Sequence, residues 1–150
     1  MHSYRRRGFQ HERDLARKLW DHGFAVMRAP ASGSKAKYTK YPDLVAIMDR
    51  HIFAFEVKTV YREKTIYISA VQVEKLREFI KRAGGQGYIA VKVIGESRWR
   101  FIPLNQLEET TGGNYKVPKE LIDKGLRIRD LVSMVKGDRR ITEYMGNKNS

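Results

Sequence analysis

The chain has 150 residues, a length that suits one domain with a buried core. It has no cysteine, which excludes disulfides and thiolate zinc sites and favours a cytosolic compartment. A formal net charge of +13 favours a polyanionic partner, first of all nucleic acid. A membrane partner is not expected, because no long apolar span, secretory signal or lipidation signal is present. The simplest alternative is a basic surface of the kind found in ribosome-like binders.

The first part of the chain predicts a helix followed by three strands. Apolar residues lie along one stripe of residues 5–22, and Gly23 is a plausible end of that helix. Residues 29–41 form a loop rich in Ser, Gly, Lys and Tyr. The three strands are expected over residues 24–28, 43–48 and 52–58, with a turn at 49–51 between the last two.

The second part predicts a helix, two strands and a further helix. Ser69 can cap a helix that runs to about Ala83 and ends at Gly84-Gly85. The other elements are an extended piece over 65–68, strands over 87–94 and 98–102, a helical turn over 103–109, a loop-like stretch over 110–125 and a short amphipathic helix over 127–136. The last dozen residues are polar and are expected to fray.

This order of elements predicts one α/β domain over residues 1–150, with a central mixed β-sheet flanked by α-helices. The core is expected over residues 4–103, and residues 104–150 form a C-terminal extension. Near-continuous apolar runs at 44–48 and 88–91 predict central strands that are buried on both faces.

Asp43, Glu56 and Lys58 form the most informative pattern. Side chains alternate along a strand, so Glu56 and Lys58 point the same way, and the predicted hairpin brings Asp43 near both. Carboxylates held close together in apolar strands are costly unless a cation lies between them. A hard divalent cation such as Mg²⁺ meets that need with oxygen ligands. The alternative is a simple salt bridge between Glu56 and Lys58 on a solvated edge.

This chemistry fits hydrolysis of a phosphodiester. One or two Mg²⁺ ions bridged by Asp43 and Glu56, with the Val57 carbonyl as a further ligand, can polarise the scissile phosphate and generate a hydroxide. Lys58 can position or deprotonate the attacking water, or neutralise charge in the transition state. The sequence does not choose between these roles.

Further candidates flank the three charged residues. Glu12 lies near the edge of the apolar stripe of the first helix and is either a further metal ligand or a solvated residue. Arg13 is a phosphate contact or a solvated neighbour. The loop before Asp43 is either a connector or a DNA-binding segment. The residues of that loop that we expect to contact DNA are Ser34, Lys35, Lys37 and Lys40.

Gln72 has two interpretations of equal weight. Ser69-x-x-Gln72 matches a capping box, and Gln72 can also reach a phosphate or the attacking water. The run Arg5-Arg6-Arg7 is interpreted as a solvated phosphate-binding arm rather than a catalytic group.

Together these residues resemble the archaeal Holliday junction resolvases of Hjc type, which are PD-(D/E)xK nucleases with a restriction-endonuclease-like fold. The resemblance covers about residues 4–103 and, more weakly, the C-terminal segment. The motifs that carry it are Glu12-Arg13, residues 23–34, Pro42-Asp43, Glu56-Val57-Lys58 and Gly84-Gly85.

The resemblance implies a homodimer with two metal sites, which recognises a four-way DNA junction by shape and nicks two opposing strands symmetrically. It implies that Glu12, Asp43 and Glu56 bind metal, that Lys58 is the catalytic lysine and that Ser32 is a catalytic loop serine.

The resemblance also implies binding contacts. Arg13 and Arg28 match arginines that contact DNA, and Phe79 matches an aromatic residue of the dimer interface. A second interface aromatic of some members is Ala83 here.

The leading hypothesis is therefore a cytoplasmic, nucleoid-associated endonuclease that resolves four-way junctions with Mg²⁺, or with Mn²⁺ as a substitute. One alternative is a repair endonuclease of the same superfamily that acts on flap or duplex DNA. The other is a non-catalytic junction-binding architectural protein. A replication or repair protein as an additional partner is not identified.

Overall fold

The computed structural model describes residues 2–30 and 40–137, with side chains from residue 10 onward. Residues 128–137 form a helix that packs on the sheet. The remaining elements, in chain order, are α1 (His2–Asp21), β1 (Ala25–Arg28), β2 (Leu44–Met48), β3 (His51–Val60), β4 (Ile66–Ile68), α2 (Ala70–Ala83), β5 (Gln86–Val93), β6 (Trp99–Pro103), η2 (Leu104–Gln106), β7 (Glu108–Glu109), β8 (Tyr115–Val117) and α3 (Lys119–Ile122).

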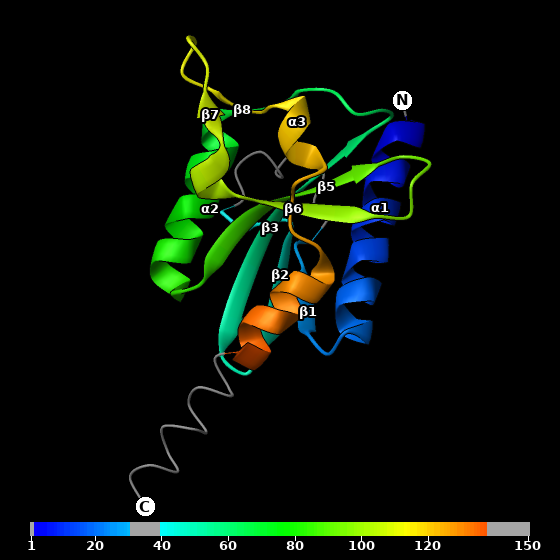
Figure 1. Ribbon diagram of the computed structural model, residues 1–150, viewed down its shortest axis with the longest axis vertical. Coiled ribbons are helices and arrows are strands. Elements are labelled where there is room, and N and C mark those ends of the chain that lie inside the picture. The colour runs from blue at the N-terminus through cyan, green and yellow to red at the C-terminus, as the bar shows by residue number, and fades with distance from the viewer. Residues whose placement is uncertain (1, 31–39, 138–150) are drawn as a thin grey trace, which may run out of the picture.

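A five-stranded mixed sheet forms the centre of the fold, in the order β1-β2-β3-β5-β6. Strands β1, β2 and β3 are antiparallel neighbours, β3 and β5 are parallel, and β6 runs antiparallel to β5. The parallel pair requires a crossover, and α2 lies within it. Helix α1 covers one side of the sheet and α2 the other (Figure 1). The predicted fold class is confirmed.

Each face of the sheet has its own core. On the first face, Phe53 and Phe55 of β3 pack with Leu15 and Leu19 of α1 and with Leu131 of the helix at 128–137. The core of the second face is formed by Val73 of α2, Ile89 and Val91 of β5, Val117 of β8 and Ile122 of α3. Because side chains alternate along β3, the face opposite Phe55 is the one that Glu56 and Lys58 share with α2.

The β2–β3 hairpin is tighter than the sequence predicts. Met48 pairs with His51, so the turn contains only Asp49 and Arg50, and His51 already belongs to β3. Both turn residues have positive φ, 48° and 70°. This conformation twists in the sense that strands require, which allows a two-residue connection.

Helix α2 begins and ends where the sequence predicts. The Ser69 hydroxyl accepts a hydrogen bond from the Gln72 N–H at 3.2 Å, and left-handed Gly84 donates its N–H to the Ile80 carbonyl. Gly85 is required for a different reason, since a Cβ there would lie 2.2 Å from the Ile52 carbonyl oxygen. The glycine pair therefore ends the helix and lets the chain pass close to β3.

The prediction of a loop over 110–125 is wrong, because this stretch contains β8 and α3. Strand β8 pairs with β4, about 50 residues earlier, and its stability depends on packing of Tyr115 and Val117 against the second core. The predicted helical turn over 103–109 shortens to η2 and is followed by β7. The helix predicted over 127–136 is confirmed at 128–137. The expected fraying of the last dozen residues lies outside the described residues.

Burial on both faces is confirmed for β5 but is wrong for β2. Residues 88–91 are all buried, whereas Ile47 of β2 is 37% exposed. The cause is the position of α2, which packs on β3 and β5 and leaves that face of β2 uncovered. Other differences are small: α1 begins at His2 rather than residue 5, and β3 runs to Val60 rather than residue 58.

Candidate active site

Asp43 and Glu56 face each other at one end of the β2–β3 hairpin. Leu44 pairs with Phe55, and one step further along this register Asp43 lies opposite Glu56. Side chains at opposed positions share a face and have Cβ atoms about 4.5–5.5 Å apart. The Val57 N–H donates to Asp43 Oδ2 at 2.8 Å, which fixes the Asp43 carboxylate beside β3. The predicted meeting of the two carboxylates is therefore present.

Glu56 is only 3% exposed, and only one of its two carboxylate oxygens has polar partners in the described part of the chain. Its Oε1 lies 3.5 Å from Lys75 Nζ and accepts a hydrogen bond from Gln72 Nε2 at 3.4 Å. Its Oε2 is buried and has no hydrogen-bond partner among the described residues. A buried carboxylate oxygen without a donor is costly, so this atom is suited to bind a cation.

Lys58 is oriented through Gln72. Lys58 Nζ donates to Gln72 Oε1 at 3.0 Å, and the amide group of the same Gln72 donates to Glu56. The Gln72 side chain thus bridges the lysine and the carboxylate, while only its backbone N–H takes part in the Ser69 cap. Lys75, one helical turn later, is a site residue that the sequence analysis missed. Only the packing of α2 against β3 reveals it.

The electrostatics of the pair favour a bound cation. The pKa of Glu56 is raised to about 7 in total: burial and then the Asp43 charge raise it, and Lys75 and Lys58 oppose the shift. Burial also raises the pKa of Asp43, against the Val57 hydrogen bond and the same two lysines. The two lysines therefore do not fully compensate the buried negative charge.

Glu12 approaches this pair from α1 but does not complete a cluster. Its Oε2 lies 3.7 Å from Arg28 Nη2. The pKa of Glu12 is raised to about 7 in total, by burial and then by the Asp43 charge and against Arg28, so the two carboxylates interact electrostatically. Within residues 10–30 and 40–137, however, no group of three or more His, Cys, Asp or Glu side chains is arranged to hold a metal. The proposed role of Glu12 as a ligand stays a prediction.

The oxygen atoms at this end of the β2–β3 hairpin suit a hard divalent cation. Backbone N–H and C=O groups of one strand residue point to the same side. Since the Val57 N–H points at Asp43, the Val57 carbonyl is directed to the same place, beyond the last residue pair of β2 and β3. Two carboxylates and one carbonyl form the oxygen set that Mg²⁺ or a similar ion prefers.

The predicted DNA contacts are only partly described. Arg13 and Lys40 are exposed, and Arg28 is half-buried with its Nε unpartnered among the described residues. Residues 5–7 lie in α1, but their side chains are outside the described part. The loop predictions Ser32, Ser34, Lys35 and Lys37 also lie outside it.

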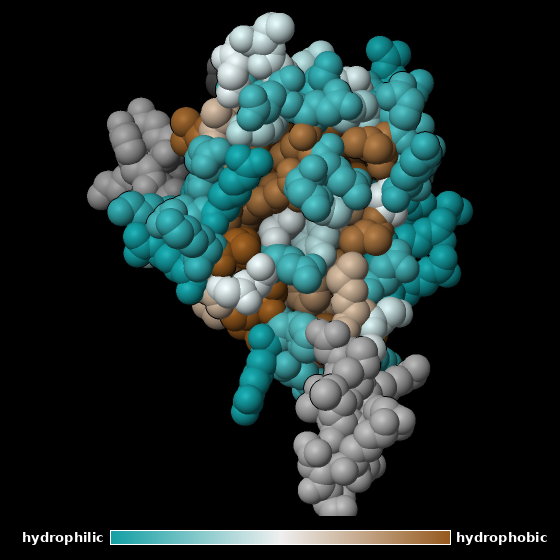
Figure 2. Space-filling model, turned by 60° about the vertical axis from the view of Figure 1, so that its left-hand side comes forward, coloured by the Kyte–Doolittle hydropathy of each residue, from teal (hydrophilic) through white to brown (hydrophobic). Residues whose placement is uncertain are grey.

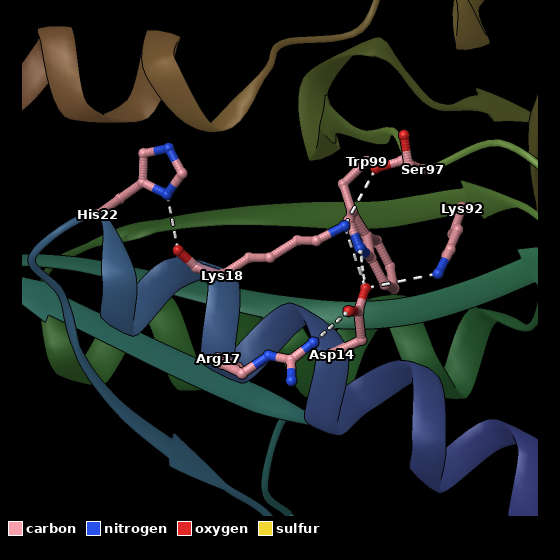
Figure 3. A network of polar contacts seen from close by, with 7 residues as sticks. All are labelled: Asp14, Arg17, Lys18, His22, Lys92, Ser97 and Trp99. Atoms are coloured by element: carbon pink, nitrogen blue, oxygen red, sulfur yellow. Dashed lines mark hydrogen bonds and ion pairs between the residues drawn. The ribbon is translucent and has the colours of Figure 1, made fainter.

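A polar network that the sequence did not reveal fixes α1, and with it Glu12, to the sheet (Figure 3). Asp14 accepts a hydrogen bond from Trp99 Nε1 at 3.1 Å and lies 3.3 Å from Lys18 Nζ and 3.4 Å from Lys92 Nζ. Burial raises the pKa of Asp14, but the Trp99 hydrogen bond and the two lysines outweigh it and lower the net pKa. The carboxylate therefore stays charged and joins α1 to β5 and β6.

The protein is thus an α/β domain whose mixed sheet has two facing carboxylates and a lysine at the end of one hairpin, an arrangement that suits a metal-dependent nuclease. A family model described as "Archaeal holliday junction resolvase (hjc)" matches residues 3–140. The chain therefore belongs to the family of archaeal Holliday junction resolvases, and it is an endodeoxyribonuclease.

Individual relatives agree with this assignment. The chain is 43% identical to a crossover junction endodeoxyribonuclease Hjc of Sulfurisphaera tokodaii over 135 residues, which cover 90% of this chain and 92% of the relative. It is 37% identical to the Archaeoglobus fulgidus protein of the same name over 125 residues, 83% of this chain and 88% of the relative. The solved structure of Archaeoglobus fulgidus Hjc, a Holliday junction resolvase, matches with a TM-score of 0.72 at 36% identity, covering 83% of this chain and 98% of that one.

Proposed function

We propose that the protein is a Mg²⁺-dependent, structure-selective endonuclease that resolves four-way DNA junctions by paired, symmetric nicks. The observation that carries the proposal is the buried Asp43–Glu56 pair with its unpartnered Glu56 Oε2. Mn²⁺ is expected to substitute for Mg²⁺, because both accept oxygen ligands.

Different residues of the chain would bind the ion, stabilise the reacting phosphate and hold the ligands in place. Asp43, Glu56 and the Val57 carbonyl would hold the ion, which when bound supplies Lewis-acid activation of the phosphate and of the attacking water. Lys58, held by Gln72, places a positive charge beside the reacting phosphate and stabilises the charge that develops there. Lys75 keeps Glu56 in position by its 3.5 Å ion pair.

Affinity and selectivity would come from different sources. Basic side chains near the site, such as Arg13, Arg28 and Lys40, bind backbone phosphates without regard to sequence. Selectivity would come from the geometry of the junction. We place this activity on the DNA of the nucleoid in the cytoplasm. No helix among residues 2–30 and 40–137 has the length and apolar character needed to span a bilayer.

We also propose a homodimer, because paired nicks need two sites and a two-fold dimer presents them symmetrically. On the face of β1 and β2 that α2 leaves uncovered, Met27 is 71% exposed and Ile47 is 37% exposed. Phe79 follows Lys75 by one helical turn, so both lie on the same side of α2. On the side of the molecule that Figure 2 brings forward, hydrophobic residues lie across the middle of the surface with hydrophilic ones around them.

The dimer is tested by placing a charge on the uncovered face. The double variant Met27→Lys/Ile47→Lys is expected to shift the protein from dimer to monomer in light scattering and to remove the pairing of nicks, since two buried lysines oppose association. Tyr67→Lys is the control, because Tyr67 is 68% exposed on β4, outside this face. A wild-type protein that is monomeric at micromolar concentration contradicts the dimer.

The proposed function is tested with a labelled immobile junction, incubated with and without Mg²⁺, with nicks mapped on all four strands. We expect two nicks in opposing strands, at equivalent positions, only when the metal is present. Preferential cutting of linear duplex or flap DNA would indicate a repair endonuclease instead. Tight binding with no cleavage in Mg²⁺ or Mn²⁺ would indicate an architectural protein.

A further inference from the structure

A strongly basic pocket lies at the edge of the sheet formed by β6. Its volume is about 280 Å³, and it opens between α1, the turn before β6 and the start of the helix at 128–137. Its lining contains no acidic side chain, and its basic side chains are Lys18, Arg98, Arg100, Arg127 and Arg129.

Backbone pairing at the sheet edge gathers these side chains. Phe101 and Leu126 exchange two hydrogen bonds of 2.8 and 2.9 Å, so Arg127 follows directly beside Arg100 of β6. The Arg127 N–H then donates to Asp130 Oδ2 at 2.7 Å, which caps the helix that follows. The position of the arginines is therefore fixed by the fold.

The arginines of the pocket form no ion pair with a described residue. Arg100 is 8% exposed, and its Nη1 donates to the Trp99 carbonyl at 3.2 Å, whereas its Nε is buried without a hydrogen-bond partner among the described residues. Arg98, Arg127 and Arg129 are exposed and form no ion pair with a described residue. Lys18, by contrast, donates to the Ser97 carbonyl at 3.1 Å and pairs with Asp14, as Figure 3 shows.

Like charges at this edge repel one another. Burial, followed by the charges of Arg127 and Arg98, lowers the pKa of Arg100, although Asp123 and Glu96 oppose this shift. Those two acids and Glu63 line a separate, smaller pocket, which Arg98 and Arg100 also line. An anion in the basic pocket would offset the excess positive charge of its lining, in which the side chains of Arg127 and Arg129 have no acidic partner among the described residues.

The pocket and the candidate active site lie at the same end of the sheet. Lys58 pairs with Val91, and Val91 pairs with Arg100, so these residues occupy one row across β3, β5 and β6. Two strand spacings put the backbones of Lys58 and Arg100 about 10 Å apart. Lys58 lies on the face that α2 covers, and Lys18 and Trp99 of the pocket lie on the α1 face. A nucleic-acid backbone that passes around this end of the sheet can contact both places, which a small free anion cannot do.

We propose that this basic pocket binds a backbone phosphate of the junction arm that lies beside the cleaved strand. The inference rests on the proposed junction-binding function and extends its binding surface to β6 and the helix at 128–137. Arginine suits this task because its planar guanidinium group can donate two hydrogen bonds to one phosphate.

The test compares Arg127→Ala/Arg129→Ala with Lys81→Ala/Arg82→Ala. The control pair removes the same charge from exposed positions in the last turn of α2. Binding of a labelled junction is measured without divalent metal as a function of salt. The slope of log K against log salt is expected to fall by about 1 to 2 for the pocket variant, with roughly tenfold weaker binding at 0.1 M salt for each phosphate contact that the substitutions remove. The control variant is expected to change the slope of log K against log salt less than the pocket variant does.

The possible outcomes separate the two proposals. If the wild-type protein cleaves the junction and the pocket variant keeps the wild-type salt slope, the phosphate site is wrong while the nuclease function stands. If inorganic phosphate stabilises wild type but not the pocket variant, and junction binding is equal for both, the pocket binds free phosphate and the DNA assignment fails. A wild-type protein that binds no junction overturns both proposals.

Discussion

Replacing Asp43 with Asn or Glu56 with Gln is expected to lower the rate of junction cleavage by roughly a thousandfold or more. Each change keeps the size of the side chain but removes one of the two negative charges that would hold the ion. Loss of groups that only orient metal ligands already costs about 10–100-fold, so loss of a ligand itself should cost more. Junction binding should stay within about threefold of wild type, because affinity comes from the basic surface.

Single-turnover cleavage and metal-free binding on the same labelled junction measure the two effects separately. Glu78→Gln is the control, since it removes a carboxylate from α2 that pairs with Arg82 rather than with a residue of the site. Wild-type cleavage by either site variant would exclude the pair from catalysis. Parallel loss of binding and cleavage would mean that the substitutions disturb the fold.

The part of the site that the sequence predicts depends on local geometry. Strand alternation puts Glu56 and Lys58 on one face, and a hairpin with a short turn brings Asp43 opposite Glu56. Both rules act over fewer than 20 residues, so the pattern of charges and apolar residues is sufficient. The same is true of α2, whose cap and terminal glycines are adjacent to the apolar stripe they enclose.

The parts that the sequence did not reveal depend on contacts between distant segments. Lys75 is one of several charged residues on α2, and only the position of this helix over β3 makes it a partner of Glu56. The Asp14–Trp99 contact joins residues 85 positions apart. Strand β8 has only three residues and forms because β4 and the second core are in place. No local pattern encodes these contacts.

Metal-free protein in which Glu56 is replaced by Gln is expected to be more stable than wild type above pH 7. In the folded state the pKa of Glu56 is about 7, against 4.5 for an ordinary glutamate. Between these values the folded protein retains a proton that the unfolded chain releases. The free energy of unfolding of wild type therefore falls as pH rises through this window, and Glu12 acts in the same direction. The glutamine side chain of the variant does not titrate, so the variant should gain roughly 1–3 kcal/mol at pH 8 and nothing near pH 4.

Urea unfolding in a chelator at pH 4 to 8 measures this difference, and addition of Mg²⁺ at pH 8 tests its cause. An ion that binds only the folded state stabilises it in proportion to site occupancy, so Mg²⁺ should raise the stability of wild type and leave Glu56→Gln nearly unchanged. The exposed control Glu78→Gln should follow the stability of wild type closely over the whole pH range. If wild type without metal is as stable as Glu56→Gln at pH 8, the buried carboxylates are already compensated. The principal structural reason for a cation at this site would then be lost, because the cost of the uncompensated charge is what metal binding is expected to relieve.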